Sequence, residues 1–153
     1  MTESNTPAVR TEGVWKIFQQ EAEEVQAAHD VSLTVERGEF TALAGPSGSG
    51  KTTLLNVIGG LTRPTRGKVW VAGQEVTDMS NQELAQLRLE QVGFIFQAYN
   101  LLPVLTAMEN AEFPMLLQGI ADDERAARIG ELFERTGISG LEDRRPGKLS
   151  GGQ

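Results

Sequence analysis

Alternating hydrophobic and polar positions in the N-terminal part of the chain predict β-strands. Val31, Leu33 and Val35 stand between polar neighbours, and this period of two is typical of a half-buried strand. Residues 13–18 form a shorter apolar and aromatic stretch that also favours a strand. Residues 19–28 are polar and charged enough to predict a loop or the end of a hairpin. The N-terminal part is therefore expected to contribute strands to a sheet.

Two segments are apolar throughout instead of alternating. Residues 40–44 (FTALA) and 92–96 (VGFIF) have the continuous pattern of strands buried on both faces, as in a parallel sheet. A glycine-rich loop follows the first segment directly, and residues 51–58 then predict a helix that two glycines stop. Strand, loop and helix in this order predict a mixed α/β arrangement.

Capping signals predict three further helices, and a hairpin precedes them. Residues 68–76 predict the hairpin, with its turn at a glycine. Residues 80–83 (SNQE) and 106–109 (TAME) each match the capping box, in which Ser or Thr at the N-cap is followed three residues later by Glu. A third helix is expected to begin near residue 122, where two aspartates favour the helix dipole, and to end at Gly137.

Composition and charge narrow the class of protein. The chain has 153 residues, of which 39% are hydrophobic and 23% charged, and this is ordinary for a soluble globular protein. A formal net charge of −7 argues against a nucleic-acid partner, because phosphate backbones are bound by clustered Lys and Arg. The sequence has no Cys, no apolar run long enough to span a bilayer and no apolar stretch typical of a signal peptide. We therefore expect a cytoplasmic protein without direct membrane insertion.

One short motif carries recognisable chemistry. Residues 45–52 (GPSGSGKT), here called the P-loop, match the phosphate-binding pattern G-x-x-x-x-G-K-[ST]. Polyphosphate is best held by many backbone N–H groups that point into one concavity, and glycines let the backbone approach it closely. Lys51 is expected to reach the β and γ phosphates, and the Thr52 hydroxyl to ligate Mg²⁺. The alternative is a glycine-rich turn with an exposed lysine. The residues predicted to bind nucleotide here are Gly45, Pro46, Ser47, Gly48, Ser49, Gly50, Lys51, Thr52 and Thr53.

Three further features resemble one family when read in order around the P-loop. The last five residues, LSGGQ, are Leu149, Ser150, Gly151, Gly152 and Gln153. They resemble the signature motif of ATP-binding cassette (ABC) proteins, and the P-loop and this motif follow one another in the order typical of that family. Gln97 matches the family's Q-loop glutamine, and Phe18 matches the aromatic that stacks on adenine, where the family more often has Tyr. Taken alone, each has a simpler interpretation: a turn, a strand-end glutamine and a core phenylalanine.

The resemblance implies a fold and an organisation for the whole chain. The fold class would be α/β: a P-loop NTPase core with an incomplete parallel sheet, an antiparallel β subdomain and a helical subdomain. A disordered tail is expected over residues 1–10 and a partial ATP-binding domain over residues 11–153. Within that domain, the β subdomain and core part would cover residues 11–97, and the helical subdomain residues 98–153.

The resemblance also implies ligands and partners. ATP and Mg²⁺ would be bound, with Thr52 and Gln97 as metal ligands and Phe18 stacked on the base. Residues 150–153 would contact the γ-phosphate of ATP held by a second ATP-binding subunit in a head-to-tail dimer. Gln97 and its neighbours would also touch a membrane permease.

Three stretches narrow the resemblance to one branch of the family. NVIGGLTRPTRGKV, MSNQELAQLR and VGFIFQAYNLLPVLTAMENAEFP look like the branch that serves lipoprotein release and macrolide efflux. In that branch the ATPase drives a permease. The resemblance therefore implies a subunit that couples Mg-ATP binding and hydrolysis to export, and that lies on the inner face of the plasma membrane through the permease.

The catalytic residues of the family would follow Gln153. They are the Walker B Asp, a Glu that polarises the attacking water and a His that contacts γ-phosphate. Residues 141–143 (LED) lack the preceding apolar strand, and His29, the sole histidine, is interpreted as a surface or strand-edge residue. We therefore expect a C-terminally truncated cassette. Two alternatives stay open: a nucleotide-binding fragment that does not hydrolyse ATP, and a soluble, non-transport cassette protein of translation or DNA repair.

Overall fold

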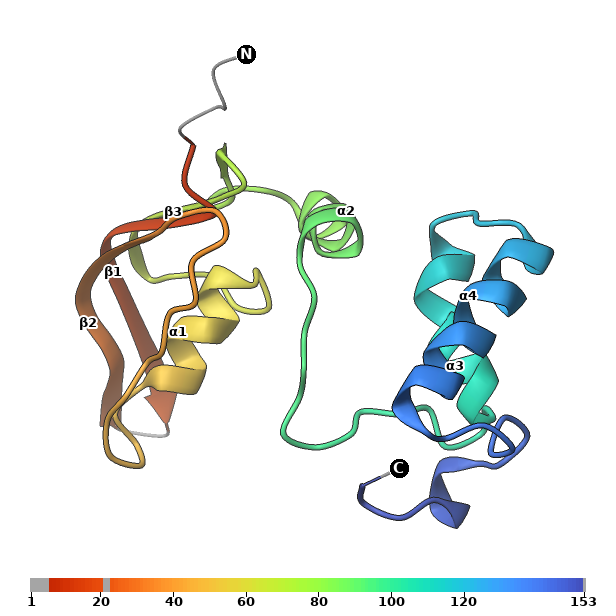
Figure 1. Ribbon diagram of the computed structural model, residues 1–153. Helices are drawn as coiled ribbons and strands as arrows, with labels where there is room; N and C mark the ends of the chain where they lie inside the picture. Colours follow the sequence, from red (N-terminus) through yellow and green to blue (C-terminus); the bar gives the residue numbers. More distant parts are fainter. Residues whose placement is uncertain (1–5, 21–22, 153) are drawn as a thin grey trace. The chain divides into compact units, whose positions relative to one another are not determined.

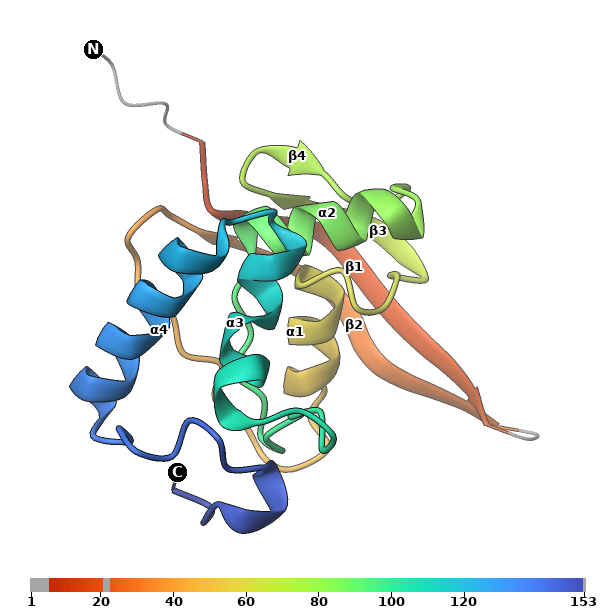
Figure 2. The same ribbon diagram turned by 90° about the vertical axis from the view of Figure 1, so that its right-hand side faces the viewer.

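The computed structural model describes residues 6–20 and 23–152. They form two compact units, one ending at Val92 and the other beginning at Gly93, and each is described by itself (Figures 1 and 2). We call them the N-terminal unit and the C-terminal unit. The mixed α/β class predicted from the sequence is confirmed, and the described sheet lies in the N-terminal unit.

An antiparallel sheet with strand order β2-β1-β3-β4 forms one layer of the N-terminal unit. Its strands are β1 (Val9–Gln20), β2 (Glu23–Val35), β3 (Arg66–Val71) and β4 (Gln74–Glu75). β1 and β2 pair along most of their length, but their register shifts at three places. Such shifts bend a hairpin and increase its twist, because an extra residue on one strand is left unpaired.

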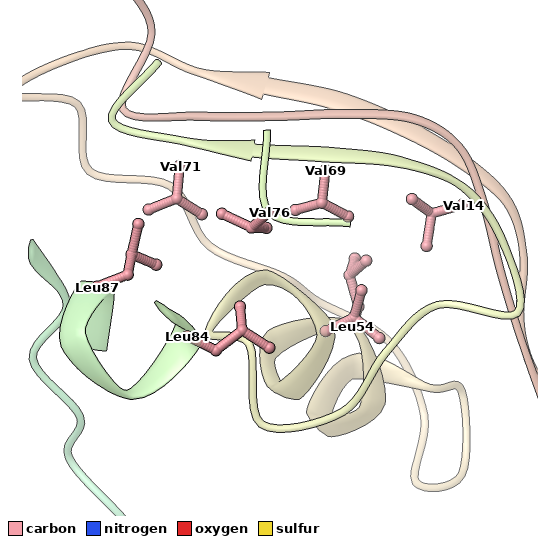
Figure 3. Packing of buried hydrophobic residues seen from close by; sticks show 8 residues of the cluster. Val14, Leu54, Val69, Val71, Val76, Leu84 and Leu87 are labelled. Carbon is pink, nitrogen blue, oxygen red and sulfur yellow. The ribbon is translucent and has the colours of Figure 1, made fainter. Parts of the chain in front are cut away.

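Two helices cover one face of this sheet: α1 (Lys51–Ile58) and α2 (Asn81–Gln91). Because side chains alternate along a strand, Val69 and Val71 of β3 point toward the helices, while Trp70 between them lies on the other face. Buried side chains from the sheet, the helices and the segment after β4 meet in one apolar cluster (Figure 3). Its members are Val14, Leu54, Val57, Val69, Val71, Val76, Leu84 and Leu87.

The C-terminal unit contains a helical hairpin of α3 (Ala107–Leu117) and α4 (Asp122–Thr136), followed by a 3₁₀ helix, η1 (Pro146–Lys148). Arg125 of α4 joins the two helices: its Nε donates to Glu112 Oε2 at 3.3 Å, and its Nη1 donates to the Ile120 carbonyl at 2.7 Å. The buried hydrophobic side chains described in this unit are Ile129 and Phe133 of α4. Local hydrogen bonds and ion pairs therefore contribute much of what holds the C-terminal unit together.

Helix boundaries follow the capping signals of the sequence. The hydroxyls of Ser80 and Thr106 each accept a hydrogen bond from the backbone N–H of the glutamate three residues later, so both predicted capping boxes are formed. α1 covers the predicted residues 51–58, and α4 ends at Gly137, whose φ of 72° is left-handed. The four predicted helices are thus confirmed. Of the helices in the described part of the chain, none combines the length and the apolar character that a membrane span requires.

The two strands predicted from continuous apolar runs are wrong. Residues 40–44 and 92–96 belong to no strand among residues 6–20 and 23–152, and the sheet described there has no parallel pair. Phe40 and Ile95 are 96% and 103% exposed. A strand needs a hydrogen-bonded neighbour, and a run apolar on both faces needs cover on both. Neither condition is met within the described residues, so both segments lie as extended chain outside the sheet.

Three boundaries also differ from the prediction. β1 begins at Val9, inside the predicted tail, and β2 begins at Glu23, inside the segment predicted as a loop or hairpin end. A polar hairpin arm can still pair, because the ladder is formed by backbone groups. The compact units divide between Val92 and Gly93, whereas the predicted subdomain boundary follows Gln97.

Candidate functional site

The P-loop leads into α1, and Lys51 is the first residue of that helix. Its Nζ donates hydrogen bonds to the carbonyl oxygens of Gly45 at 2.9 Å and Pro46 at 2.7 Å, and lies 3.3 Å from Ser49 Oγ. The backbone of the P-loop therefore surrounds the Lys51 ammonium group. A cation held by a ring of backbone is suited to meet an anion, because no side-chain carboxylate neutralises it among these partners.

The N-terminus of α1 differs from those of α2 and α3. Its N-cap is Gly50 with φ 86°, and within the described residues it has neither a side-chain cap nor an acidic residue in its first turn. α2 and α3 use a Ser or Thr cap and a first-turn glutamate instead. The first N–H groups of a helix have no partner inside the helix. At α1 they stay available together with the positive end of the dipole, and this arrangement fits a phosphate group.

A β-bulge in β2 supports the P-loop. Lys16 pairs with Ala28 and Ile17 pairs with Gln26, so Ala27 is an extra residue on the β2 side. The Ala27 carbonyl oxygen lies so close to Gly50 that a Cβ there would come within 1.9 Å of it. Gly50 is therefore required both for its left-handed φ and for this backbone contact. Sequence reasoning missed Ala27, because no residue pattern in β2 reveals where its register shifts.

Two cavities lie beside the P-loop. The smaller, of about 270 Å³, is lined by P-loop residues, by Thr52 and Thr53 of α1, and by residues 25–27 of β2. The larger, of about 530 Å³, is lined by the same loop and by residues of β2 as far as Val31. His29, interpreted from the sequence as a surface or strand-edge residue, lines the larger cavity, and its ring meets Trp15 edge-on with the centroids 3.9 Å apart. As described, neither cavity includes an Asp or Glu.

Phe18, the predicted base-stacking residue, lies near the end of β1 and is 38% exposed. Neither cavity, as described, includes it, but its cross-strand partner Val25 lines the smaller one. Side chains directly opposite on paired strands are neighbours on one face of the sheet. The Lys16 ammonium lies 4.9 Å from the centroid of the Phe18 ring. The pairing thus brings the predicted aromatic to the border of the cavity that Thr52 and Thr53 line.

Gln97 lies in the C-terminal unit, in exposed chain before α3. Thr52, the other predicted Mg²⁺ ligand, belongs to the N-terminal unit. Among the residues that the structure describes, no group of three or more His, Cys, Asp or Glu side chains could hold a metal ion. Ligation by Thr52 and Gln97 therefore stays a prediction.

The signature residues follow η1 in the C-terminal unit. Ser150, Gly151 and Gly152 are exposed, and Leu149 and Ser150 line a cavity of about 590 Å³ with Tyr99 and the apolar residues 94–96. A Cβ on Gly151 would come within 2.6 Å of the Tyr99 hydroxyl. Gln153, the last predicted signature residue, lies outside the described residues. No residue pattern in the sequence predicts that an aromatic side chain lies against Gly151 of this motif.

Comparison with known proteins identifies relatives of this chain. The family model described as ABC transporter matches residues 28–153. An uncharacterized ABC transporter ATP-binding protein of Thermotoga maritima is 49% identical over 140 residues, which are 92% of this chain and 60% of that protein. The macrolide export ATP-binding/permease protein MacB 1/2 of Paracoccus denitrificans is 42% identical over 153 residues, which are 100% of this chain and 23% of that protein.

A solved structure is also similar. It is described as the dimeric structure of a post-hydrolysis state of the ATP-binding cassette MJ0796 bound to ADP and Pi. It shares 37% sequence identity and a TM-score of 0.89, and the match covers 95% of this chain and 64% of that one. This chain spans less than two thirds of the length of each of these three proteins.

Proposed function

The chain belongs to the ABC transporter family, and on that premise we propose that it binds Mg-ATP at its P-loop as the nucleotide-binding part of an export system. The observation that carries the proposal is the N-terminus of α1. There an uncapped helix, a left-handed Gly50 and the Lys51 ammonium converge within the described P-loop. Each favours an anion, and a triphosphate is the anion that the P-loop pattern is built for.

The residues of the site have separate tasks in this proposal. Lys51 leaves its own carbonyl partners to contact the β and γ phosphates, while the N–H groups of the first turn of α1 bind the same oxygens. The Thr52 hydroxyl and Gln97 hold Mg²⁺, which neutralises charge on the terminal phosphates when it is bound. Phe18 stacks on the adenine. Support comes from the cross-strand pairing of Phe18 with Val25 beside the smaller cavity.

The partners are a second ATP-binding subunit and a permease. Residues 150–153 are proposed to contact ATP held by the second subunit. The solved MJ0796 cassette is dimeric, which supports such an arrangement, and the exposed backbone of Gly151 and Gly152 suits contact with an anion. The Paracoccus relative is a macrolide export ATP-binding/permease protein. We therefore propose that the chain works on the inner face of the plasma membrane through a permease, in macrolide or lipoprotein export.

Replacing Lys51 tests the binding proposal. A hydrogen bond to a charged group contributes about 1.5–3 kcal/mol, so Lys51→Ala is expected to weaken Mg-ATP binding by about 10- to 100-fold in titration calorimetry. The matched control is Lys68→Ala, since Lys68 lies on β3 and pairs with Glu75 instead of facing the P-loop. Equal affinities of Lys51→Ala and the unaltered chain for Mg-ATP would contradict the proposal.

Hydrolysis is a separate question, because both cavities beside the P-loop are described without a carboxylate that could orient water. Binding without turnover is therefore the second candidate for this chain. Phosphate release distinguishes the two: turnover that Lys51→Ala abolishes and Lys68→Ala retains would exclude binding alone. Co-purification with a permease, absent for a cassette protein of translation or DNA repair, tests the transport assignment.

A further inference from the structure

Lys16 is fixed over one face of Phe18. Its Nζ lies 4.9 Å from the centroid of the Phe18 ring and donates a hydrogen bond of 2.9 Å to the Arg63 carbonyl oxygen. The two residues are two positions apart on β1, where side chains share a face of the sheet. A lysine that is held by its ammonium and contacts an aromatic face loses the freedom that an exposed lysine usually keeps.

Residues 59–65 contain the Arg63 carbonyl that accepts from Lys16, and this segment is itself hydrogen-bonded to β1 and to α1. The Ile17 N–H donates to Thr65 Oγ1 at 3.0 Å, and the Thr65 N–H donates to the Trp15 carbonyl at 2.7 Å, so this segment is bonded to the edge of β1. It begins where α1 ends, and the Leu61 N–H donates back to the Asn56 carbonyl at 2.8 Å. The helix that starts at the P-loop therefore leads directly to the carbonyl that positions Lys16.

We propose that Lys16 is a positioning residue for base stacking: anchored by the Arg63 carbonyl, it holds the Phe18 ring in place for the base of the bound nucleotide. This inference rests on the proposed function, in which Phe18 stacks on adenine. With the ammonium on the ring, the 38% of Phe18 that stays exposed is the surface a base can cover. A ring fixed in advance loses less side-chain freedom when the base binds, and so binds it more tightly.

The neighbouring cation–π pair provides the matched control. The Lys68 ammonium lies 5.9 Å from the centroid of the Trp70 ring, on β3, and it also pairs with Glu75 at 3.2 Å. Neither Lys68 nor Trp70 lines the described cavities beside the P-loop. Lys68→Met therefore removes a comparable lysine from a comparable ring without touching the proposed site.

The test compares Mg-ATP with magnesium tripolyphosphate, which offers the phosphates without a base. Lys16→Met on the full chain is expected to weaken Mg-ATP binding by about two- to five-fold, the range of an exposed cation–π pair. Its affinity for tripolyphosphate should not change. Lys16→Arg keeps a cation and a donor, so it should restore most of the affinity for Mg-ATP. Lys16→Gln keeps a donor for the Arg63 carbonyl but no charge, and it should behave like Lys16→Met. Lys68→Met should match the unaltered chain with both ligands.

The outcomes separate this inference from the proposed function. If Lys16→Met weakened the binding of both Mg-ATP and tripolyphosphate, the effect would be a general electrostatic or structural one, and the positioning role would be overturned. An unchanged affinity for Mg-ATP, in a background where Phe18→Ala weakens it, would also overturn that role but leave the proposed function standing. Failure of the unaltered chain to bind either ligand would reject the proposed function itself.

Discussion

The N-terminal and C-terminal units are organised by contacts of different range. In the N-terminal unit, Val14 of β1 and Leu84 of α2 are far apart in the sequence but share one cluster, at 0% and 5% exposure. In the C-terminal unit, the Asn110 side chain exemplifies the local contacts. Its Nδ2 donates to the Leu102 and Thr106 carbonyls at 3.1 and 2.8 Å, and its Oδ1 accepts from the Leu102 N–H at 2.7 Å.

Large exposed hydrophobic side chains are more numerous among the described residues of the C-terminal unit than among those of the longer N-terminal unit, which exposes Phe18, Val25, Phe40, Leu43, Leu55 and Leu61. The C-terminal unit exposes large hydrophobic or aromatic residues along α3, α4 and the chain before α3: Ile95, Phe96, Tyr99, Leu101, Leu102, Val104, Phe113, Leu116, Leu117 and Leu132. Little burial leaves a region near the low end of local stability. The P-loop therefore belongs to a unit whose shape comes from its own core, whereas the signature residues belong to one that local hydrogen bonds hold.

The largest expected effect comes from truncating one leucine in each unit. Leu54 of α1 is 7% exposed in the cluster, and Leu117 of α3 is 59% exposed. Leu54→Ala should lower the free energy of unfolding of the N-terminal unit by about 2–5 kcal/mol, through lost burial and a cavity. Leu117→Ala should change the free energy of unfolding of the C-terminal unit by less than about 0.5 kcal/mol.

Urea unfolding can follow the units separately. The chain has two tryptophans, Trp15 and Trp70, both in the N-terminal unit, so their fluorescence reports that unit. Far-ultraviolet circular dichroism adds the helices of the C-terminal unit. Similar losses of unfolding free energy in Leu54→Ala and Leu117→Ala would show that the C-terminal unit also depends on a hydrophobic core. The two units would then not differ in the range of the contacts that stabilise them.

A glycine replaced in each unit should have a smaller effect. Gly50 and Gly140 both have φ of 86°, so alanine is strained at each by about 1–2 kcal/mol. A Cβ on Gly50 would also come within 1.9 Å of the Ala27 carbonyl oxygen, while a Cβ on Gly140 meets no described atom within 4 Å. Gly50→Ala should therefore destabilise its unit by at least about 1 kcal/mol more than Gly140→Ala destabilises the other. It should also weaken Mg-ATP binding. Equal losses of unfolding free energy in the two variants would show that the bulge in β2 does not support the P-loop.

The features that the sequence predicted are those set by neighbouring residues. The P-loop pattern, the capping boxes at Ser80 and Thr106 and the left-handed Gly137 all depend on a few consecutive side chains, and the structure has these helices where they were predicted. The hairpin of β3 and β4 follows from its glycine turn in the same way. Local chemistry is therefore readable from one sequence.

The features that escaped prediction depend on distant residues. The apolar run at residues 92–96 predicts a strand, but whether it pairs is decided by a neighbour that the run itself does not contain. The contact of Ala27 with Gly50 depends on a register shift between β1 and β2, which alternation alone does not fix. Phe18 could be placed on a strand, but its neighbours Lys16 and Val25 became visible only through the pairing.

The smallest expected effect concerns the capping box of α2 and its dependence on pH. Hydrogen bonds from the Ser80 hydroxyl and backbone N–H hold the pKa of Glu83 below its usual value. A carboxyl whose pKa is lowered by folding stabilises the folded state fully above its unfolded pKa, and this stabilisation is lost as the pH falls through the folded pKa. Glu83→Gln should therefore lower the unfolding midpoint of the N-terminal unit at neutral pH, and the difference from the unaltered chain should shrink below about pH 4.

Tryptophan fluorescence during thermal unfolding measures this difference across the pH range. Glu90→Gln is the matched control, because it removes the same charge from the last turn of α2, away from the N-terminal N–H groups. Its difference from the unaltered chain should not follow the Glu83→Gln profile. Glu109→Gln removes the corresponding glutamate of α3, and its effect should appear in the circular dichroism of the C-terminal unit and leave the fluorescence midpoint unchanged. A fluorescence midpoint that moves equally in Glu83→Gln and Glu109→Gln would mean that the two units unfold together, and local capping would then stabilise the whole chain instead of one unit.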